Sequence, residues 1–403
     1  MVINMSEYNN VPRIRFKGFT DVWEQRKLVN LINEYKETVT SDCTLPVLTS
    51  SKVDGVVLQE EHFGRKQNHD ITGYNILPYG YCTYRNRSDG IDFTFNINKC
   101  CKMGIISKFY PVFYGNKNNI NLISIILNNS KEVAREIGYT CSGTGQKVLS
   151  FLDLQKMNII IPNSSEQDKI SDLFDNLDNL ITLHQRKCDT LVNVKKSLLE
   201  KMFPKNSSNI PEIRFKGFTD VWEQRKLTSF VEFYNGQTYS PLNVQDKGTL
   251  VLRSSNVQNG EISKDDLVFI DSDVVNTNNV EIGDIIVVVR NGSRNLIGKH
   301  AQIKEKMTDT VIGAFMTGIR SKNSKFVNSL LNTRIFNDEI NKNMGATINQ
   351  ITGYMFSNME FKIPTNGEQS KIGELFTNLD NLITLHQHKE LKRRNDNNDN
   401  LRW

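Results

Sequence analysis

The sequence predicts an α+β protein made of two tandem mixed α/β bodies, each followed by a long helix, and two repeats support this. Residues 12–28 read PRIRFKGFTDVWEQRKL, and residues 211–227 repeat them with one change, Glu212 in place of Arg13. Residues 166–187 read EQDKISDLFDNLDNLITLHQRK and return 202 positions later as EQSKIGELFTNLDNLITLHQHK, identical at 17 of 22 positions. Repeats so far apart indicate two copies of a whole unit rather than a solenoid.

The repeats divide the chain of 403 residues into seven predicted segments. These are a frayed N-terminus (1–11), a first body (12–165), a first helix (166–203), a linker (204–210), a second body (211–364), a second helix (365–394) and a disordered polar tail (395–403). The tail is expected because ELKRRNDNNDNLRW replaces the repeat after Lys389, and its Asn/Asp run favours fraying. We therefore expect the second helix to be about a dozen residues shorter than the first.

The first long helix is predicted from apolar residues at three/four spacing over 166–203, with no Gly or Pro inside it. Ser165 is expected to cap it and Pro204 to end it. At 1.5 Å per residue such a helix would be about 57 Å long, which suits a spacer better than a core helix. The predicted packing positions of the two helices are Ile170, Leu173, Phe174, Leu177, Leu180, Ile181, Leu191, Leu198, Ile372, Leu375, Phe376, Leu379, Leu382 and Ile383.

Three aromatic residues in the opening repeat, Phe16, Phe19 and Trp23, could either stack on bases or anchor this segment to its body. Both copies keep them beside bodies of unlike sequence. We therefore expect an anchoring role.

The two bodies read as short strands separated by Gly, Asn and Asp clusters. Strands are expected at 45–48, 55–58, 79–84, 92–97 and 157–161 in the first body, and at 249–253, 267–270, 284–290 and 358–363 in the second. Helices are expected at 131–137 and 326–341.

Composition narrows the class of protein. The net charge of +5 fits a nucleic-acid binder without requiring one. All six cysteines lie before residue 189 and none forms a C-x-x-C pair, so we expect no disulfide scaffold and no metal site, and a reducing cytoplasm as the location. No stretch has the pattern of a secretion signal or the length of a membrane span. Neither a methyltransferase nor a helicase motif is recognisable, so no catalytic residue is predicted.

Side chains that can form forked hydrogen bonds to base edges cluster at predicted turns between strands. The candidate DNA contacts are Lys66, Gln67, Asn68, Arg85, Asn86, Arg87, Gln146 and Lys147 in the first body, and Arg253, Ser255, Asn256, Arg290, Asn291, Ser293, Arg294, Asn349 and Gln350 in the second. The strongest is the segment 290–294, because it ends an apolar strand and Gly292 permits close backbone approach. A solvated loop is the alternative for each cluster.

The duplicated IRFKGFTDVWEQRKL and EQ-x-KI-x-x-LF-x-NLDNLITLHQ resemble the specificity subunits of type I restriction–modification systems. The resemblance covers nearly the whole chain and implies two target-recognition domains related by a pseudo-two-fold repeat. Each domain would read one half of a split site in double-stranded DNA. The two helices would pack as an antiparallel coiled-coil spacer and dock two modification subunits.

The resemblance also assigns the chemistry to other chains. Modification subunits would use S-adenosylmethionine to methylate adenine, and restriction subunits would use ATP and Mg²⁺ to translocate and cleave DNA. This chain would hold no cofactor itself. Two other classes stay open: a self-sufficient methyltransferase or nuclease with unrecognised motifs, and a structural coiled-coil protein without a DNA role.

Overall fold

The computed structural model describes residues 11–12, 14–66, 70–143, 145–205, 208–344 and 349–400, with side chains as far as residue 387. The chain forms two compact units: unit 1 is Met1–Leu183 with Glu390–Trp403, and unit 2 is His184–Lys389. These units differ from the predicted bodies because each boundary falls inside a long helix. Residues at the start of the first helix pack on the core of unit 1, and residues at its end pack in the core of unit 2.

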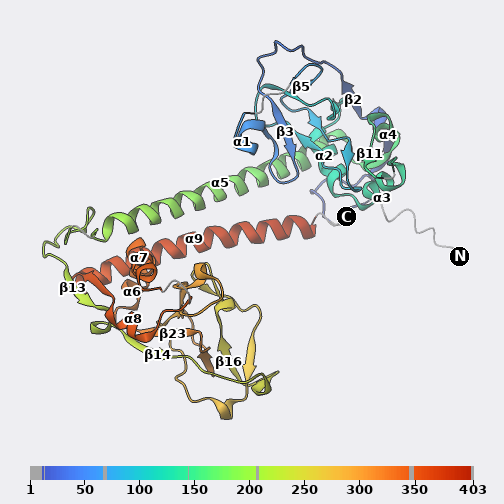
Figure 1. The fold of residues 1–403 in the computed structure, drawn as a ribbon. Helices are drawn as coiled ribbons and strands as arrows, with labels where there is room; N and C mark the ends of the chain where they lie inside the picture. Colours follow the sequence, from blue (N-terminus) through green and yellow to red (C-terminus); the bar gives the residue numbers. More distant parts are fainter. Residues whose placement is uncertain are drawn as a thin grey trace. The chain divides into compact units, whose positions relative to one another are not determined.

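Unit 1 combines short strands with four short helices (Figure 1). Its strands are β1 (Glu24–Lys27), β2 (Ile32–Tyr35), β3 (Leu48–Ser51), β4 (Gly55–Leu58), β5 (Asn75–Pro78), β6 (Cys82–Thr83), β7 (Arg87–Ser88), β8 (Asn96–Ile97), β9 (Met103–Ile106), β10 (Val112–Gly115), β11 (Lys147–Val148) and β12 (Asn158–Ile161). Its short helices are α1 (Gln59–Phe63), α2 (Ile120–Asn129), α3 (Lys131–Thr140) and α4 (Phe151–Lys156).

Unit 2 repeats this plan. Its strands are β13 (Glu223–Lys226), β14 (Glu232–Asn235), β15 (Val244–Gln245), β16 (Thr249–Leu252), β17 (Val257–Gln258), β18 (Glu261–Ile262), β19 (Val268–Ile270), β20 (Ile285–Val288), β21 (His300–Gln302), β22 (Thr310–Ile312), β23 (Met316–Arg320) and β24 (Glu360–Ile363). Its short helices are α6 (Ser324–Leu331), α7 (Arg334–Asn343) and α8 (Gly353–Asn358).

The main sheets of the two units share one topology. The order is β2-β10-β6-β8 in unit 1 and β14-β23-β20-β21 in unit 2, with all neighbours antiparallel. A separate strand pair also recurs: β1 pairs with β12 and β13 with β24, in the same register. The units differ in their remaining strands, because unit 2 has a second four-stranded sheet, β15-β19-β16-β22, where unit 1 has the pairs β3-β4 and β5-β9.

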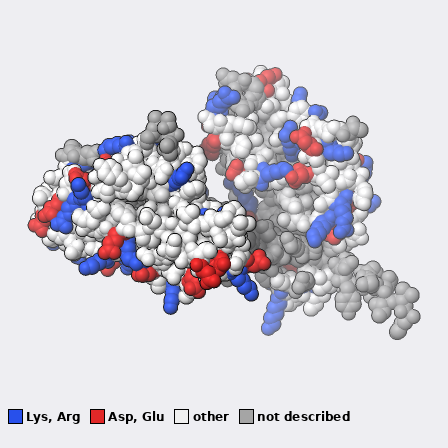
Figure 2. Space-filling view, turned by 60° about the horizontal axis from the view of Figure 1, so that its bottom comes forward, with Lys and Arg blue, Asp and Glu red and all other residues white. Residues whose placement is uncertain are grey.

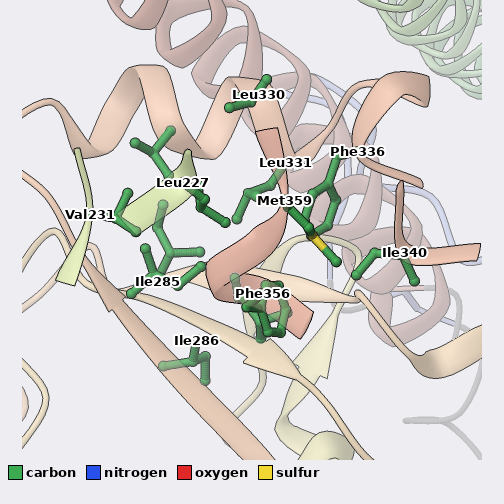
Figure 3. Packing of buried hydrophobic residues seen from close by; sticks show 14 of the residues in the cluster. Leu227, Val231, Ile285, Ile286, Leu330, Leu331, Phe336, Ile340, Phe356 and Met359 are labelled. Carbon is green, nitrogen blue, oxygen red and sulfur yellow. The ribbon is translucent and has the colours of Figure 1, made fainter. Parts of the chain in front are cut away.

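The core of unit 2 lies between its main sheet and the helices α6, α7 and α8 (Figure 3). β20 is buried along its whole length because helices and strands cover it, and Ile285 contributes to this core. Leu330 of α6, Phe336 of α7 and Phe356 of α8 converge there, each at most 1% exposed. Burial of apolar surface contributes about 25 cal/mol per Å², so these side chains stabilise the fold of unit 2.

The structure corrects one helix prediction and adds one helix that was not predicted. The predicted helix over 326–341 is two helices, because Thr333 ends α6 and starts α7: its hydroxyl donates to the Leu330 carbonyl and accepts from the Phe336 N–H. The helix α2 was not predicted, since its apolar run INLISIILNN has no clear helical period.

The long helices are α5 (Ser164–Met202) and α9 (Asn366–Asn400), green and red in Figure 1. Asn163, rather than the predicted Ser165, caps α5, because its side-chain oxygen accepts from the Glu166 N–H at 3.1 Å. α9 continues beyond the predicted end at residue 394. Neither Gly nor Pro follows Gly373 in α9, so no residue type that breaks helices stops it there.

Candidate nucleic-acid interface

The duplicated sequences build the same clasp in each unit. In unit 1 the clasp consists of Arg15, β1, β12 and the start of α5. Arg15 donates two hydrogen bonds to Glu166, Nε to Oε1 at 2.7 Å and a terminal nitrogen to Oε2 at 2.8 Å. Arg214 and Glu368 form the same fork in unit 2, at 2.7 and 2.8 Å. The hydrogen bonds to the glutamates raise the pKa of each arginine further above its usual value.

Each clasp glutamate is at most 1% exposed and lies in the first turn of its helix. The positive end of the helix dipole and the arginine together stabilise its charge. The neighbouring glutamines also match: Gln167 donates to the Pro162 carbonyl and Gln369 to the Pro364 carbonyl, both at 2.9 Å. The repeats therefore encode a frame that joins opening segment, closing strand and helix.

The aromatic residues of the opening repeat belong to this frame, which confirms their predicted anchoring role. Trp23 is 8% exposed in the core of unit 1 and Phe16 packs against that core. The Lys169 ammonium lies 4.9 Å from the centre of the Phe19 ring. These rings therefore hold the frame together.

Three candidate clusters of the second body meet at one end of the main sheet of unit 2. Arg290, just after β20, forms an antiparallel bridge with Gln350. Asn349 donates to the Gly292 carbonyl at 3.0 Å, and Asn291 donates to the Ser254 hydroxyl at 3.1 Å. The side chains of Arg290, Ser293 and Arg294 are exposed on this surface. The rigid strand mount expected for the 290–294 segment is therefore present.

Two candidates in this region serve the fold instead. Asn256 is fully buried and donates to the carbonyls of Ser263 and Asp265 at 3.3 and 2.8 Å, while accepting from the Arg253 N–H. The prediction that it contacts DNA is wrong, because its polar atoms close a turn. The Arg253 guanidinium is paired with Asp266 at 2.6 Å, so it is not freely available either. Ser255 is exposed.

In unit 1 the strands β7 and β11 bring two candidate clusters together. Arg87 lies opposite Val148, and Lys147 opposite Ser88. Arg85 and Gln146 are exposed beside this ribbon. Asn86 is half-buried and its backbone bonds to both flanking segments. The Lys147 ammonium donates to the Gly143 carbonyl at 2.9 Å, which partly satisfies it within the loop.

The third cluster of the first body is only partly visible. Lys66 is exposed after α1, and Gln67 and Asn68 lie outside the described residues. Nothing in the described contacts joins Lys66 to the β7–β11 ribbon.

Two exposed aromatic residues beside these clusters were missed. Phe109 is 38% exposed and Phe315 is 53% exposed. The Arg87 guanidinium lies 4.6 Å from the centre of the Phe109 ring, and the Arg290 guanidinium lies 5.1 Å from that of Phe315. Both distances suit a cation–π contact. A lone phenylalanine in a loop gives no sequence signal for such a contact.

The charges of the surface are mixed. In Figure 2, Lys and Arg side chains are interspersed with Asp and Glu on the visible face. Many of the surface cations lie in ion pairs, such as Lys304–Glu261 and Lys264–Glu305. Individual unpaired cations therefore matter more here than a broad basic patch.

Within unit 2, the end of α5 and the start of α9 run antiparallel. Lys195 pairs with Asp380 at 2.6 Å, and His184 Nδ1 lies 3.0 Å from His386 Nδ1, with one imidazole donating and the other accepting. The ring centres of Phe203, the residue after α5, and of Phe376, in the first part of α9, lie 6.3 Å apart. These contacts run in opposite directions along the two helices, as the predicted spacer requires.

The predicted apolar stripe is buried only in part. Ile372, Phe376 and Ile170 are at most 8% exposed. Leu173, Leu180 and Leu382 are more than 40% exposed, so they lie at the surface of the described chain. The remaining stripe positions are half-buried, namely Phe174, Leu177, Ile181, Leu191, Leu198, Leu375, Leu379 and Ile383. Met202, which continues the apolar period of the first helix, is buried in unit 2, as are Leu199 and Phe203, which were not predicted.

The described residues include no group of three or more His, Cys, Asp or Glu side chains placed to hold a metal ion. None of the described helices is both long and apolar enough to cross a membrane.

Comparison with known proteins places both repeats in one family. Residues 21–193 and 219–393 each match the family described as the type I restriction modification DNA specificity domain. The MjaVIII type I restriction enzyme specificity subunit of Methanocaldococcus jannaschii is 24% identical over 254 residues, 60% of each chain. The StySPI specificity subunit of Salmonella potsdam is 26% identical over 162 residues, 38% of this chain and 35% of that one. The matches therefore span less than two thirds of these relatives.

Solved structures share the fold. A type I restriction-modification S subunit from M. genitalium has a TM-score of 0.57 at 13% identity, covering 97% of this chain and 98% of the other. A chain from a study of the assembly and conformational transition of a type I system has a TM-score of 0.51 at 13% identity, covering 94% and 96%.

Proposed function

Because the chain belongs to the family of type I restriction–modification DNA specificity domains and carries two of them, we propose that it reads a split DNA site, one half-site per body. It acts as a non-catalytic recognition subunit. One observation carries this proposal. The main sheets of the two units share one topology, and exposed arginines lie at the same end of each sheet.

The architecture supports separate readings by the two bodies. The clasps are nearly identical, so both bodies are mounted in the same way. The loops that carry the candidate contacts differ in sequence, with Arg87 and Val148 paired in one body and Arg290 and Gln350 in the other. Different side chains on one frame select different bases.

Membership of the family supports a proposal about the partners. We infer that the chain directs two modification subunits and the restriction subunits to the site, and that S-adenosylmethionine, ATP and Mg²⁺ act in those partners. The long helices α5 and α9 set the gap between half-sites and offer the docking surface. The location that fits this role is the cytoplasm.

The test is to map methylated adenines in cells that carry this chain together with its modification subunits. The expected result is one split sequence with two fixed half-sites and a constant gap. Its absence in cells with active partners would contradict the proposal. Methyl transfer to DNA by the pure chain alone would support a self-sufficient enzyme, and sequence-independent binding by the assembled complex would support a purely structural protein.

A further inference from the structure

The two units share a surface element that the sequence repeats do not include. It is an arginine stacked on an exposed phenylalanine, Arg87 on Phe109 and Arg290 on Phe315, called here the Arg–Phe pair. In unit 1 the two residues are 22 positions apart, and in unit 2 they are 25 apart. The separations differ, so the equivalence of the two pairs rests on the structure.

The backbone around the two pairs is equivalent. In unit 1 the residue before the arginine donates its N–H to the phenylalanine carbonyl, Asn86 to Phe109 at 2.9 Å; in unit 2, Val289 donates to Phe315 at 2.9 Å. The carbonyls of these same two residues accept from Leu149 at 3.0 Å and from Ile351 at 2.8 Å.

The strand pairing extends the equivalence. Arg87 lies opposite Val148, and Arg290 lies opposite Gln350, both in antiparallel register. The arginine follows β6 in unit 1 and the equivalent strand β20 in unit 2. The phenylalanine precedes β10 in unit 1 and the equivalent strand β23 in unit 2. The two pairs thus occupy one position of a common frame.

The chemistry of the pair favours an external ligand. Both arginines are exposed, and neither forms an ion pair with a carboxylate among the residues that the structure describes. By contrast, Arg15, Arg214 and Arg320 are tied to buried carboxylates. A guanidinium stacked on a ring keeps its N–H groups free around its edge while its orientation is fixed.

The phenylalanine ring of unit 1 contacts more than one cation. In unit 1 a second cation, the Lys108 ammonium, lies 5.8 Å from the centre of the Phe109 ring. An exposed phenylalanine costs solubility, and its repetition at one site of two unlike bodies is explained by the arginine that it orients.

We propose that Arg87 and Arg290 are the matched base-reading residues of the two bodies, each donating a fork to a guanine edge in its own half-site. Phe109 and Phe315 are positioning residues that hold the fork. This inference rests on the proposed function. Guanine is the expected base because its O6 and N7 are both acceptors in the major groove and fit a bidentate arginine.

The test uses the complete complex with its modification subunits and a plasmid library in which every position of both half-sites is randomised in turn. Arg87→Ala should lower the preference for guanine at one position of one half-site by about 10-fold or more. Arg290→Ala should do the same in the other half-site only. Arg135→Ala and Arg334→Ala, exposed arginines on the corresponding helices α3 and α7, are the matched controls and should leave both half-sites unchanged.

Variants of the phenylalanine separate positioning from packing. Phe109→Leu keeps apolar volume but removes the ring, so it should weaken the guanine preference at the position that Arg87 reads. Phe109→Tyr keeps the ring and should retain that preference. Equal behaviour of the two variants would remove the positioning role.

The outcomes distinguish this inference from the function on which it rests. If the unaltered complex methylates no split site, the proposed function fails. If it does, but the alanine variants weaken methylation of every sequence equally and flatten its salt dependence, the arginines contact phosphate and base reading is refuted. An unchanged base preference in both variants would also overturn the inference.

Discussion

The two bodies resemble one another at two levels that do not coincide. The clasps are alike in sequence and structure, down to the Arg15–Glu166 and Arg214–Glu368 forks. The main sheets are alike in structure but unlike in sequence. The two units therefore keep the same sequence in the clasps. Their main sheets keep the same topology but differ in sequence, and so do the surfaces that these sheets carry.

The two units also differ in how their cores are packed. Phe376 of α9 is 1% exposed, and Phe203, the residue after α5, packs beside it in unit 2. Phe174 occupies the corresponding position of the helix repeat in unit 1 but is only half-buried. The core of unit 2 therefore includes a side chain that directly follows α5.

The largest expected effect concerns this difference. Phe376→Ala should destabilise unit 2 by about 3–5 kcal/mol, because it leaves a cavity in a closed core. Phe174→Ala should cost unit 1 about 1–2 kcal/mol, since less buried area is lost. Hydrogen exchange of β20 peptides and β10 peptides reports the two units separately. Equal losses of protection would show that the two cores are equivalent.

A second prediction concerns the clasps, where the bodies should behave alike. Glu166→Gln and Glu368→Gln each remove the charge of a buried glutamate from its arginine. Each should lower the free energy of unfolding of its own unit by about 3 kcal/mol. This is the lower end of the range for a buried pair, because the arginines reach water. Glu24→Gln, in the exposed Arg26 pair, is the control and should cost less than about 1 kcal/mol. The same exchange measurement applies, and markedly unequal losses at the two glutamates would contradict a shared frame.

The smallest expected effect is at the residue opposite each arginine. Val148→Gln and Gln350→Val should change the stability of their units by less than about 1 kcal/mol, because both sites are short strand pairs. Glutamine favours adenine, and an apolar side chain favours the thymine methyl. Val148→Gln should therefore shift one base preference in its half-site towards adenine, and Gln350→Val should shift one in the other half-site towards thymine. Methylation of the randomised library measures the shift, and no shift in either variant would place this position outside the interface.

Much of the fold was predictable because the repeats and the apolar strands carry local signals. The strand predicted at 249–253 and the helix stripe from Ile170 onward are examples. The break at Thr333 was missed because an apolar period runs across it while a single hydroxyl satisfies both helix ends.

The candidate site was less predictable. Side-chain type suggested Asn256 as readily as Arg290, yet burial separates them, and burial depends on contacts distant in the sequence. The Arg–Phe pairs depend on strands brought together by the fold, such as Arg87 beside Phe109, so no local pattern could indicate them.

The most direct test of one body reading one half-site is an exchange of the bodies. The structure gives the cut points: exchanging residues 29–156 with 228–358 leaves both clasps intact, since the bonds from Leu28 to Met157 and from Leu227 to Met359 lie at their edges. Methylated adenines are then mapped in cells that carry the chimera and its modification subunits. We expect the same two half-sites in swapped order, whereas an assembled, active chimera that still methylates the original order would contradict one body reading one half-site.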